Sequence, residues 1–254
     1  METLQKIAVP AAAIAAFLAL WELIVWANGW PNYVMAAPSD LPAAYARFWV
    51  LFLEMGWQTL WRTVLGLGLA VLFGTALGMV MGFSRLAREA LYPLLVGFNA
   101  VPKATLVPVL ALLFIGQHDF NTVLMAFLIS FFPIAVSVGI GLSTLEPEYR
   151  DILRALGASR FTIFRKIALP KTLPEFFGAL KVSVTLAFIG TNLVEIVSPH
   201  GRGLGALFKS GETNGDYPLM FAVLIALAFL GIVLYYAVVL LERIFAGWAE
   251  RPQG

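Results

Sequence analysis

The chain has 254 residues, of which 60% are hydrophobic and only 13% are charged, and its formal net charge is +2. This composition excludes an ordinary soluble domain, because a chain of this length folded around one aqueous core would not need such an apolar surplus. The absence of cysteine excludes a disulfide scaffold and cysteine-ligated metal sites, and the near-neutral charge gives no footprint for nucleic-acid binding. We therefore expect a lipid-facing surface.

The first apolar run, residues 7–26, is long enough to cross a bilayer and follows Lys6. A cleaved signal peptide is the alternative, but the run is long for the apolar core of one, and no convincing small-residue cleavage site follows soon. Turns are expected at residues 29–31 and 38–40. Residues 41–53 are then predicted to form a short helix with exposed aromatic residues at the membrane interface.

Five further apolar runs predict transmembrane helices, at residues 59–83, 92–116, 122–142, 176–197 and 219–241. The run at 92–116 is interrupted by three prolines, Pro93, Pro102 and Pro108, and the next run is kinked at Pro133. Connections are expected between the runs, as a short loop at 84–90, a polar turn at 117–121 and a glycine-rich polar loop at 198–218. The chain is thus predicted to be an all-α polytopic membrane protein with about six transmembrane helices.

Small residues recur every four positions along the second span, at Gly66, Ala70, Gly74, Gly78 and Gly82. They form a continuous seam on one face of the predicted helix. In lipid such a seam lets another helix approach closely, so we expect these residues to pack against a neighbouring helix.

The segment 146–174 is an unusually basic interruption between two apolar runs. It holds six of the seventeen Lys and Arg residues of the chain, Arg150, Arg154, Arg160, Arg165, Lys166 and Lys171. Its pattern predicts a helix, a break and a second helix, with Pro147 in the first turn and Gly157 at the C-terminal cap of the first helix. Ser159 is predicted to cap the second helix, which Leu169 and Pro170 are expected to stop. We call this segment the elbow.

Each predicted helix of the elbow carries an apolar stripe. The stripe of the first helix contains Tyr149, Ile152, Leu153 and Leu156, and that of the second contains Phe161, Phe164 and Ala168. An amphipathic helical pair outside the apolar runs is expected to contact a partner.

The basic residues that lie between the spans or near their ends predict the orientation of the chain. With six spans, eleven of them fall on the side of the elbow and four on the other side, where Arg47, Arg62, Arg202 and Lys209 lie. This bias places the elbow and both termini in the cytoplasm.

The elbow resembles the loop E-A-A-x3-G-x9-I-x-L-P of permease subunits of bacterial ABC importers. Gly157 is followed after nine residues by Ile167, Ala168, Leu169 and Pro170, whereas Asp151, Ile152 and Leu153 stand where Glu-Ala-Ala is usual. Residues 37–40, 131–133 and 201–205 and the run VPKATLVPVLALLFIG (101–116) also resemble the nitrate/sulfonate/taurine-type branch of these permeases. The resemblance extends from about residue 37 to residue 243.

The resemblance implies a fold like that of type I ABC importer permeases and a coupling loop that binds a cytoplasmic ATPase. The coupling residues would be Asp151, Arg154, Ala155, Gly157, Ala158, Ser159, Arg160, Phe161, Ile167, Leu169 and Pro170. It also implies a second copy of the permease in a homodimer, an external solute-binding protein, and ATP-Mg on the ATPase, with no cofactor bound by this chain. On this basis, residues 1–58 form an N-terminal helix and interfacial segment, 59–243 the core permease and 244–254 a cytoplasmic tail.

Two ionisable residues, Lys103 and Glu195, lie at membrane depth, close to Asn99 and Asn192 respectively. Each would cost about 3 kcal/mol or more at the centre of a lipid-exposed helix, so we expect both to face protein or a water-filled cavity. They either line a translocation pathway together with the two asparagines, or form a buried Lys–Glu pair without substrate contact. A further alternative for Lys103 is that its side chain extends to the lipid headgroups. This is the preferred interpretation for Lys181.

Catalytic patterns are scarce. The two histidines, His118 and His200, have no metal-site spacing, and no G-x-x-x-x-G-K-[ST] motif occurs, so the chain is not expected to be an enzyme. A secondary transporter or channel without an ATPase is the alternative function, but no repeat and only one convincing intramembrane acid support it. The branch that the chain resembles imports sulfonates, taurine, nitrate, bicarbonate, and pyrimidine or flavin precursors, and one lysine does not choose among them.

Overall fold

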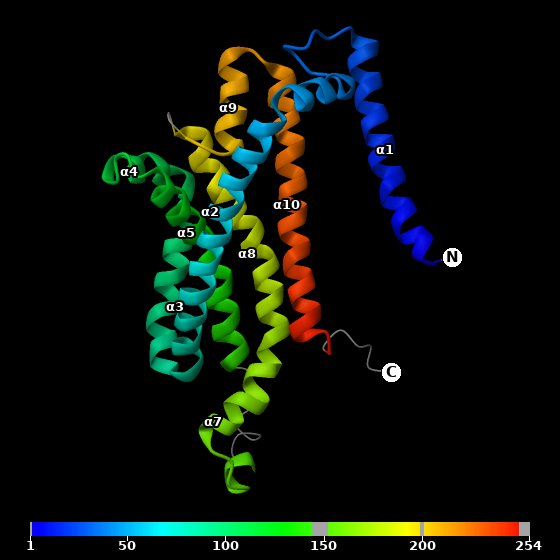
Figure 1. Ribbon diagram of the computed structural model, residues 1–254. Coiled ribbons are helices and arrows are strands. Elements are labelled where there is room, and N and C mark those ends of the chain that lie inside the picture. Colours follow the sequence, from blue (N-terminus) through cyan, green and yellow to red (C-terminus); the bar gives the residue numbers. More distant parts are fainter. Residues whose placement is uncertain (1, 144–151, 199–200, 249–254) are drawn as a thin grey trace.

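The computed structural model describes residues 2–143, 152–198 and 201–248, and these residues form helices and connecting segments without a strand (Figure 1). The α-helices are α1 (Glu2–Asn28), α2 (Leu41–Phe83), α3 (Arg85–Ala100), α4 (Leu106–Leu113), α5 (His118–Ser143), α7 (Arg160–Ile163), α8 (Leu169–Val197), α9 (Leu204–Asn214) and α10 (Tyr217–Ala246). Short 3-10 helices lie at Pro38–Asp40 and Lys103–Thr105, and a π-helical turn lies at Phe164–Ala168. The prediction of an all-α fold is confirmed.

Long apolar helices make the chain polytopic. Four segments are long and apolar enough to cross a membrane, Pro38–Phe83, His118–Ser143, Phe161–Val197 and Tyr217–Ala246. The helices Arg85–Ala100 and Lys103–Leu113, with a bend of 70° between them, make a fifth if the bent pair is counted as one span. The apolar part of α1, Ala12–Asn28, is shorter, so four or five spans are found among the described residues where about six were expected.

Helix α5 lies between α2 and α8 and packs against both of them (Figure 1). Ile134 and Val138 of α5 are buried in one cluster with Leu180 and Val184 of α8 and Leu234 of α10. Helix α1 stands at the edge of the molecule, where Trp21 and Val25 pack with residues of α2 and α10. The spans α2, α5, α8 and α10 therefore share one core.

The small-residue seam of α2 faces α5. A Cβ atom at Gly78 would lie 2.6 Å from the Cβ of Val138, and one at Gly82 would lie 2.6 Å from the Cβ of Leu142. Ala70 is fully buried. On the other side of α5, a Cβ at Gly190 of α8 would lie 3.0 Å from the carbonyl oxygen of a residue in α5. Glycines thus let α5 approach both of its neighbours closely.

Four predicted boundaries were wrong. The polar turn expected at 117–121 is mostly the first turn of α5. The short helix expected at 41–53 and the span expected at 59–83 both lie in α2, which is kinked at Phe48 (φ −118°, ψ 18°), because residues 54–58 contain no proline and Gly56 alone does not end the helix. The loop expected at 84–90 is reduced to Ser84, whose Oγ accepts a 3.2 Å hydrogen bond from the N–H of Ala87 and so caps α3. The loop expected at 198–218 contains α9, since Leu204 and Leu207 bury one face of that segment.

The interruption of the third span is due to one proline. Pro93 lies inside α3 and Pro108 lies in α4, whereas Pro102 separates the two helices. Because proline disfavours a helical conformation in the residue before it, Val101 is extended (φ −66°, ψ 127°). The chain bends here, and α4 projects sideways from the bundle (Figure 1).

Candidate functional site

The elbow lies at one end of the bundle, beyond the end of α2 (Figure 1). Residues 152–155 are helical, and Gly157 ends this turn with φ +83°. The N–H of Gly157 donates to the carbonyl of Arg154, and the N–H of Ala158 donates to that of Leu153, both at 2.9 Å. These two bonds are the Schellman pattern, so the predicted glycine cap is confirmed.

The second part of the elbow begins at a serine cap. The Oγ of Ser159 accepts a hydrogen bond of 3.1 Å from the N–H of Thr162, as predicted. The predicted stop at Leu169 and Pro170 was wrong, because the N–H of Leu169 donates to the carbonyl of Phe164, five residues earlier. This π-helical turn carries the helix into α8, with Pro170 in the first turn of α8, where its missing N–H costs little.

The elbow has an anchored face and an exposed face. Ile163 and Ala168 are buried, and the ring of Phe164 packs edge-on against that of Phe83, at the end of α2, with centroids 5.4 Å apart. Phe161 is 68% exposed, so the stripe expected from Phe161, Phe164 and Ala168 does not form one surface. Phe161 lies about one helical turn before Phe164 in the sequence.

Three apolar side chains define the exposed face, which we call the elbow patch: Ile152, Leu156 and Phe161, which are 58%, 79% and 68% exposed. Among the other predicted coupling residues, the exposed ones include Arg154, Ala155 and Leu169, and the half-buried ones are Ala158, Ile167 and Pro170. Asp151, Pro147, Tyr149, Arg150 and the side chain of Arg160 lie outside the described residues, as does His200.

At the opposite end of the bundle, the carboxylate of Glu195 is buried and held by three groups. It accepts hydrogen bonds from the hydroxyl of Thr59 (2.8 Å), the guanidinium of Arg62 (3.2 Å) and the N–H of Gly205 (3.0 Å). The glycine-rich segment 201–205 wraps around this carboxylate, and a Cβ at Gly203 would overlap it. The glycine cluster is thus a cradle for Glu195.

Arg62 extends this arrangement to α5 and the 201–205 segment. Its Nε and Nη2 both donate to Oδ1 of Asp119, the former at 2.9 Å. Its Nη2 also donates to Gln58 (3.1 Å), and its Nη1 to the carbonyl oxygen of Arg202. We call Thr59, Arg62, Asp119 and Glu195 the polar clasp, because they join α2, α5, α8 and the start of α9.

Sequence reasoning missed the clasp, since Arg62 was counted among the basic residues of a solvated face. The available signal was a second charge inside a predicted span, because Arg62 falls within residues 59–83 and a buried charge requires a partner. A Lys103–Glu195 pair, one of the alternatives for these residues, is excluded, because Glu195 is paired with Arg62. Lys181, expected to extend to the headgroups, forms an ion pair of 2.7 Å with Glu242 of α10 instead.

Lys103 lies at the break between α3 and α4. Its ammonium donates to the carbonyl oxygen (2.7 Å) and to the side-chain oxygen (2.8 Å) of Asn99, and lies 5.7 Å from the centre of the Phe98 ring. It therefore neutralises the C-terminal end of α3. Asn192 donates to the carbonyl of Phe188 (2.8 Å), and its own side-chain oxygen is buried without a hydrogen bond from the described residues. Of the four predicted pathway residues, Lys103 and Asn99 thus contact each other, whereas Asn192 and Glu195 bond to other groups.

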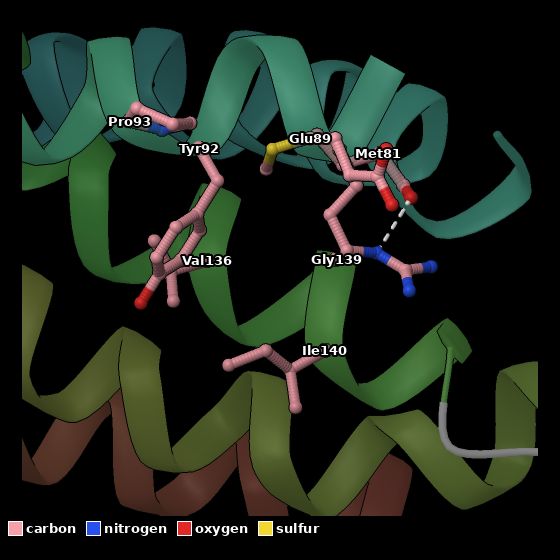
Figure 2. A pocket seen from close by; sticks show the side chains of 8 residues that line it. Met81, Glu89, Tyr92, Pro93, Val136, Gly139 and Ile140 are labelled. Carbon is pink, nitrogen blue, oxygen red and sulfur yellow. Dashed lines mark hydrogen bonds between the residues drawn. The ribbon is translucent and has the colours of Figure 1, made fainter. Parts of the chain in front are cut away.

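A cavity of about 370 Å³ lies between α2, α3 and α5 (Figure 2). Figure 2 shows Tyr92 of α3 reaching across it toward Val136 of α5. Arg88 also lines the cavity. Its guanidinium donates to the carbonyls of Met81 (3.1 Å) and Gly82 (3.3 Å) and so caps the C-terminal end of α2. The walls are mostly apolar, and among the described residues no three His, Asp or Glu side chains gather as metal ligands.

Comparison with known proteins agrees with this architecture. Residues 70–247 match the family model described as "Binding-protein-dependent transport system inner membrane component". The chain is 32% identical over 187 residues to the formylaminopyrimidine transport permease protein ThiX of Halalkalibacterium halodurans, covering 74% of each chain. It is 27% identical over 201 residues to the taurine transport system permease protein TauC of Escherichia coli, covering 78% of this chain and 72% of TauC.

A solved structure shares the fold. A chain of the MetNI methionine ABC transporter, in an inward-facing conformation, superposes with a TM-score of 0.63 at 20% identity, covering 78% of this chain and 96% of that one. Since the family model spans more than half of the sequence, the chain belongs to the binding-protein-dependent transport system inner membrane components, as a permease subunit of an ABC importer of the nitrate/taurine branch.

Proposed function

We propose that the elbow binds a cytoplasmic ATPase subunit and couples ATP hydrolysis to movement of the spans. The observation that carries this proposal is the elbow patch, in which Ile152, Leu156 and Phe161 are exposed at the protruding end of the molecule. An exposed apolar patch rimmed by polar residues is typical of a protein–protein contact. Basic residues of the same segment, Arg154 and Arg165, are exposed as well.

The anchored face of the elbow supplies the transmission. Phe164 packs on Phe83 of α2, and the π-helical turn continues directly into α8. A displacement of the elbow patch therefore acts on two spans at once. Both of these spans pack against α5, so ATPase closure and access to the pathway become one two-state equilibrium.

The remaining parts of the transporter follow from this assignment. The elbow and both termini lie in the cytoplasm, and an external solute-binding protein docks at the opposite end. ATP-Mg is bound and hydrolysed on the ATPase, and this chain carries no cofactor and no catalytic site. Lys103 and Asn99 lie at the surface of the bundle, so a pathway along them needs a second wall, which a second copy of the chain supplies in a homodimer.

The transported solute is small. ThiX is named for formylaminopyrimidine and TauC for taurine, so the relatives already differ in substrate chemistry. We propose an organic or inorganic anion of the sulfonate, taurine or nitrate class, or a pyrimidine-type precursor. Lys103 has one ammonium hydrogen beyond the two that Asn99 accepts, and it is available to an anion.

Capture of the tagged chain from solubilised native membranes tests the proposal. We expect an ATPase subunit to co-purify, and we expect the substitution Leu156→Asp to abolish this association and solute uptake in proteoliposomes. The matched control is Ile115→Asp, which places the same charge at an equally exposed aliphatic position away from the elbow.

The two variants separate the outcomes. Both chains should reach the membrane, and the Ile115→Asp variant should retain the ATPase. If Leu156→Asp retains the ATPase and uptake at the wild-type level, the elbow patch is not the coupling surface.

A further inference from the structure

The polar clasp has one buried half and one exposed half. The side chains of Arg62 and Glu195 are 3% and 1% exposed, whereas that of Asp119 is 61% exposed. All three belong to one chain of contacts in which Arg62 is the central member. The two carboxylates that share this guanidinium thus meet very different surroundings.

The buried half is complete without Asp119. Glu195 keeps its bonds from Thr59, Arg62 and the N–H of Gly205, and the hydroxyl of Thr59 accepts a 2.8 Å bond from the N–H of Leu204. If Asp119 departs, Arg62 still has Glu195, Gln58 and the carbonyl of Arg202 as partners. An unpaired buried charge is the costly outcome when a buried ion pair breaks. Release of Asp119 avoids it, because Arg62 keeps its other partners.

Asp119 itself can leave into water. It lies in the first turn of α5, directly after the connection from α4. A hollow of about 340 Å³ lies beside the pair, lined by Gln58, Trp61, Arg62, His118, Asp119 and Arg202, and polar atoms make up much of its wall. The carboxylate therefore exchanges one charged partner for hydration, as in a surface ion pair.

The end of α4 is exposed on one side, although Val107 and Leu110 earlier in α4 are buried in one cluster with Met125 of α5. Helix α4 projects from the bundle (Figure 1), and Leu112, Leu113 and Ile115 at its end are exposed. Gly116 has φ +78°, so the α4–α5 connection is a sharp turn. The Arg62–Asp119 contact ties this turn to α2, at the end of the bundle opposite the elbow.

We propose that the Arg62–Asp119 ion pair is a releasable latch of the transport cycle, in which Arg62, fixed by Glu195, positions the N-terminal end of α5 against α2 and release of Asp119 frees the α4–α5 turn. The latch rests on the proposed function, since alternating access requires one end of the bundle to open while the other closes. Arg62 and Asp119 are positioning residues here. Glu195 and the glycine cradle are the fixed base.

A reporter cysteine tests the latch in the full-length chain. The chain has no cysteine, and Thr122 is buried one turn after Asp119, with its hydroxyl bonded to the carbonyl of His118 in the same helix. In Thr122→Cys, a small charged thiol reagent should react slowly in native membranes. Adding Asp119→Asn should raise the labelling rate about 3- to 10-fold, because the ion pair then no longer holds α5.

Three further variants make the test specific to the latch. Asp119→Glu keeps the charge and should restore slow labelling. Glu212→Gln breaks an ion pair of 2.9 Å between Lys209 and Glu212 within α9, which joins no two helices, and should leave labelling unchanged. In reconstituted complexes, Asp119→Asn should raise ATPase activity without binding protein and lower the solute imported per ATP, at an unchanged melting temperature.

The outcomes are decisive in each direction. Equal labelling rates with and without Asp119→Asn overturn the latch, and so does a lowered melting temperature of Asp119→Asn, since the pair is then a structural brace. The labelling experiment needs no ATPase, so a chain that captures no ATPase contradicts the proposed function and leaves the labelling result to decide the latch.

Discussion

The backbone N–H of Gly205 donates a 3.0 Å hydrogen bond to the buried carboxylate of Glu195, ten residues earlier in the chain. This bond joins the C-terminal end of α8 to the start of α9 and gives the glycine-rich segment a physical reason. Glycine has no Cβ, so the backbone can approach a carboxylate that a larger residue would displace. The negative charge also lies at the N-terminal end of α9, where the helix dipole favours it.

Substitution of Gly203 should disturb this cradle. Gly203 has φ +129°, and a Cβ there would overlap the Glu195 carboxylate, so Gly203→Ala both strains the backbone and separates the charges. We expect a loss of stability of about 2–3 kcal/mol, read as a lowered melting temperature of the detergent-solubilised protein. Gly215→Asn is the control, because Gly215 caps α9 with φ +69°, a Cβ there would meet only the ring of Tyr217 at 4.0 Å, and asparagine tolerates that conformation. Equal melting temperatures for both variants would argue against the cradle.

The seam between α2 and α5 makes a second prediction. A Cβ at Gly78 would meet the Cβ of Val138 at 2.6 Å, so Gly78→Ala should force the two helices apart and cost about 1–3 kcal/mol. Gly68→Ala lies on the same helix, where a Cβ would meet nothing within 4 Å, and it should be neutral or slightly stabilising. Thermal unfolding of the two purified variants is the measurement. If Gly78→Ala unfolds no earlier than Gly68→Ala, the close approach of α2 and α5 is not needed for stability.

Gly157 makes a prediction in which packing plays no part. Its φ is +83° and a Cβ there would meet nothing within 4 Å, so only the backbone conformation resists substitution. Gly157→Val should cost about 1–2 kcal/mol at the elbow, misdirect the segment before α7 and weaken ATPase association. Gly157→Asn should retain most association, since asparagine is the residue that best replaces glycine at a left-handed cap. Equal pull-down of the ATPase by both variants would show that the cap does not orient the elbow.

Lys103 tests the pathway. If the α3–α4 break lines a water-filled route, Lys103→Cys should react with a small polar thiol reagent, and its rate should change when nucleotide binds the ATPase. Uptake of an anionic solute should fall in Lys103→Met. The melting temperature should change little, because the lost partner of Lys103 is Asn99, whose side chain is exposed and can bond to water instead. A cysteine that stays inert in every nucleotide state would assign Lys103 to capping α3 alone.

Much of this architecture is readable from the chain itself. Apolar runs of membrane length, the four-residue register from Gly66 to Gly82, and the glycine and serine that frame the elbow are local patterns. Their consequences are local too, because helix length, helix capping and backbone conformation at Gly157 depend on residues within a few positions of one another. For that reason the spans, the elbow and its left-handed cap could be predicted before any contact was known.

Other features depend on residues that are distant in the sequence. The sequence identifies Glu195 as an acid in a span, but its partner Arg62 lies 133 positions earlier and becomes a neighbour only when α2 packs beside α8. Likewise, the sequence marks Phe161 and Phe164 as one stripe, and the end of α2 decides that Phe164 is anchored while Phe161 stays exposed. Interactions between residues close in the sequence thus determined which helices form. The tertiary packing decided which charges are paired and which apolar side chains remain exposed. Each of these outcomes depends on which residues of a neighbouring helix lie against the side chain.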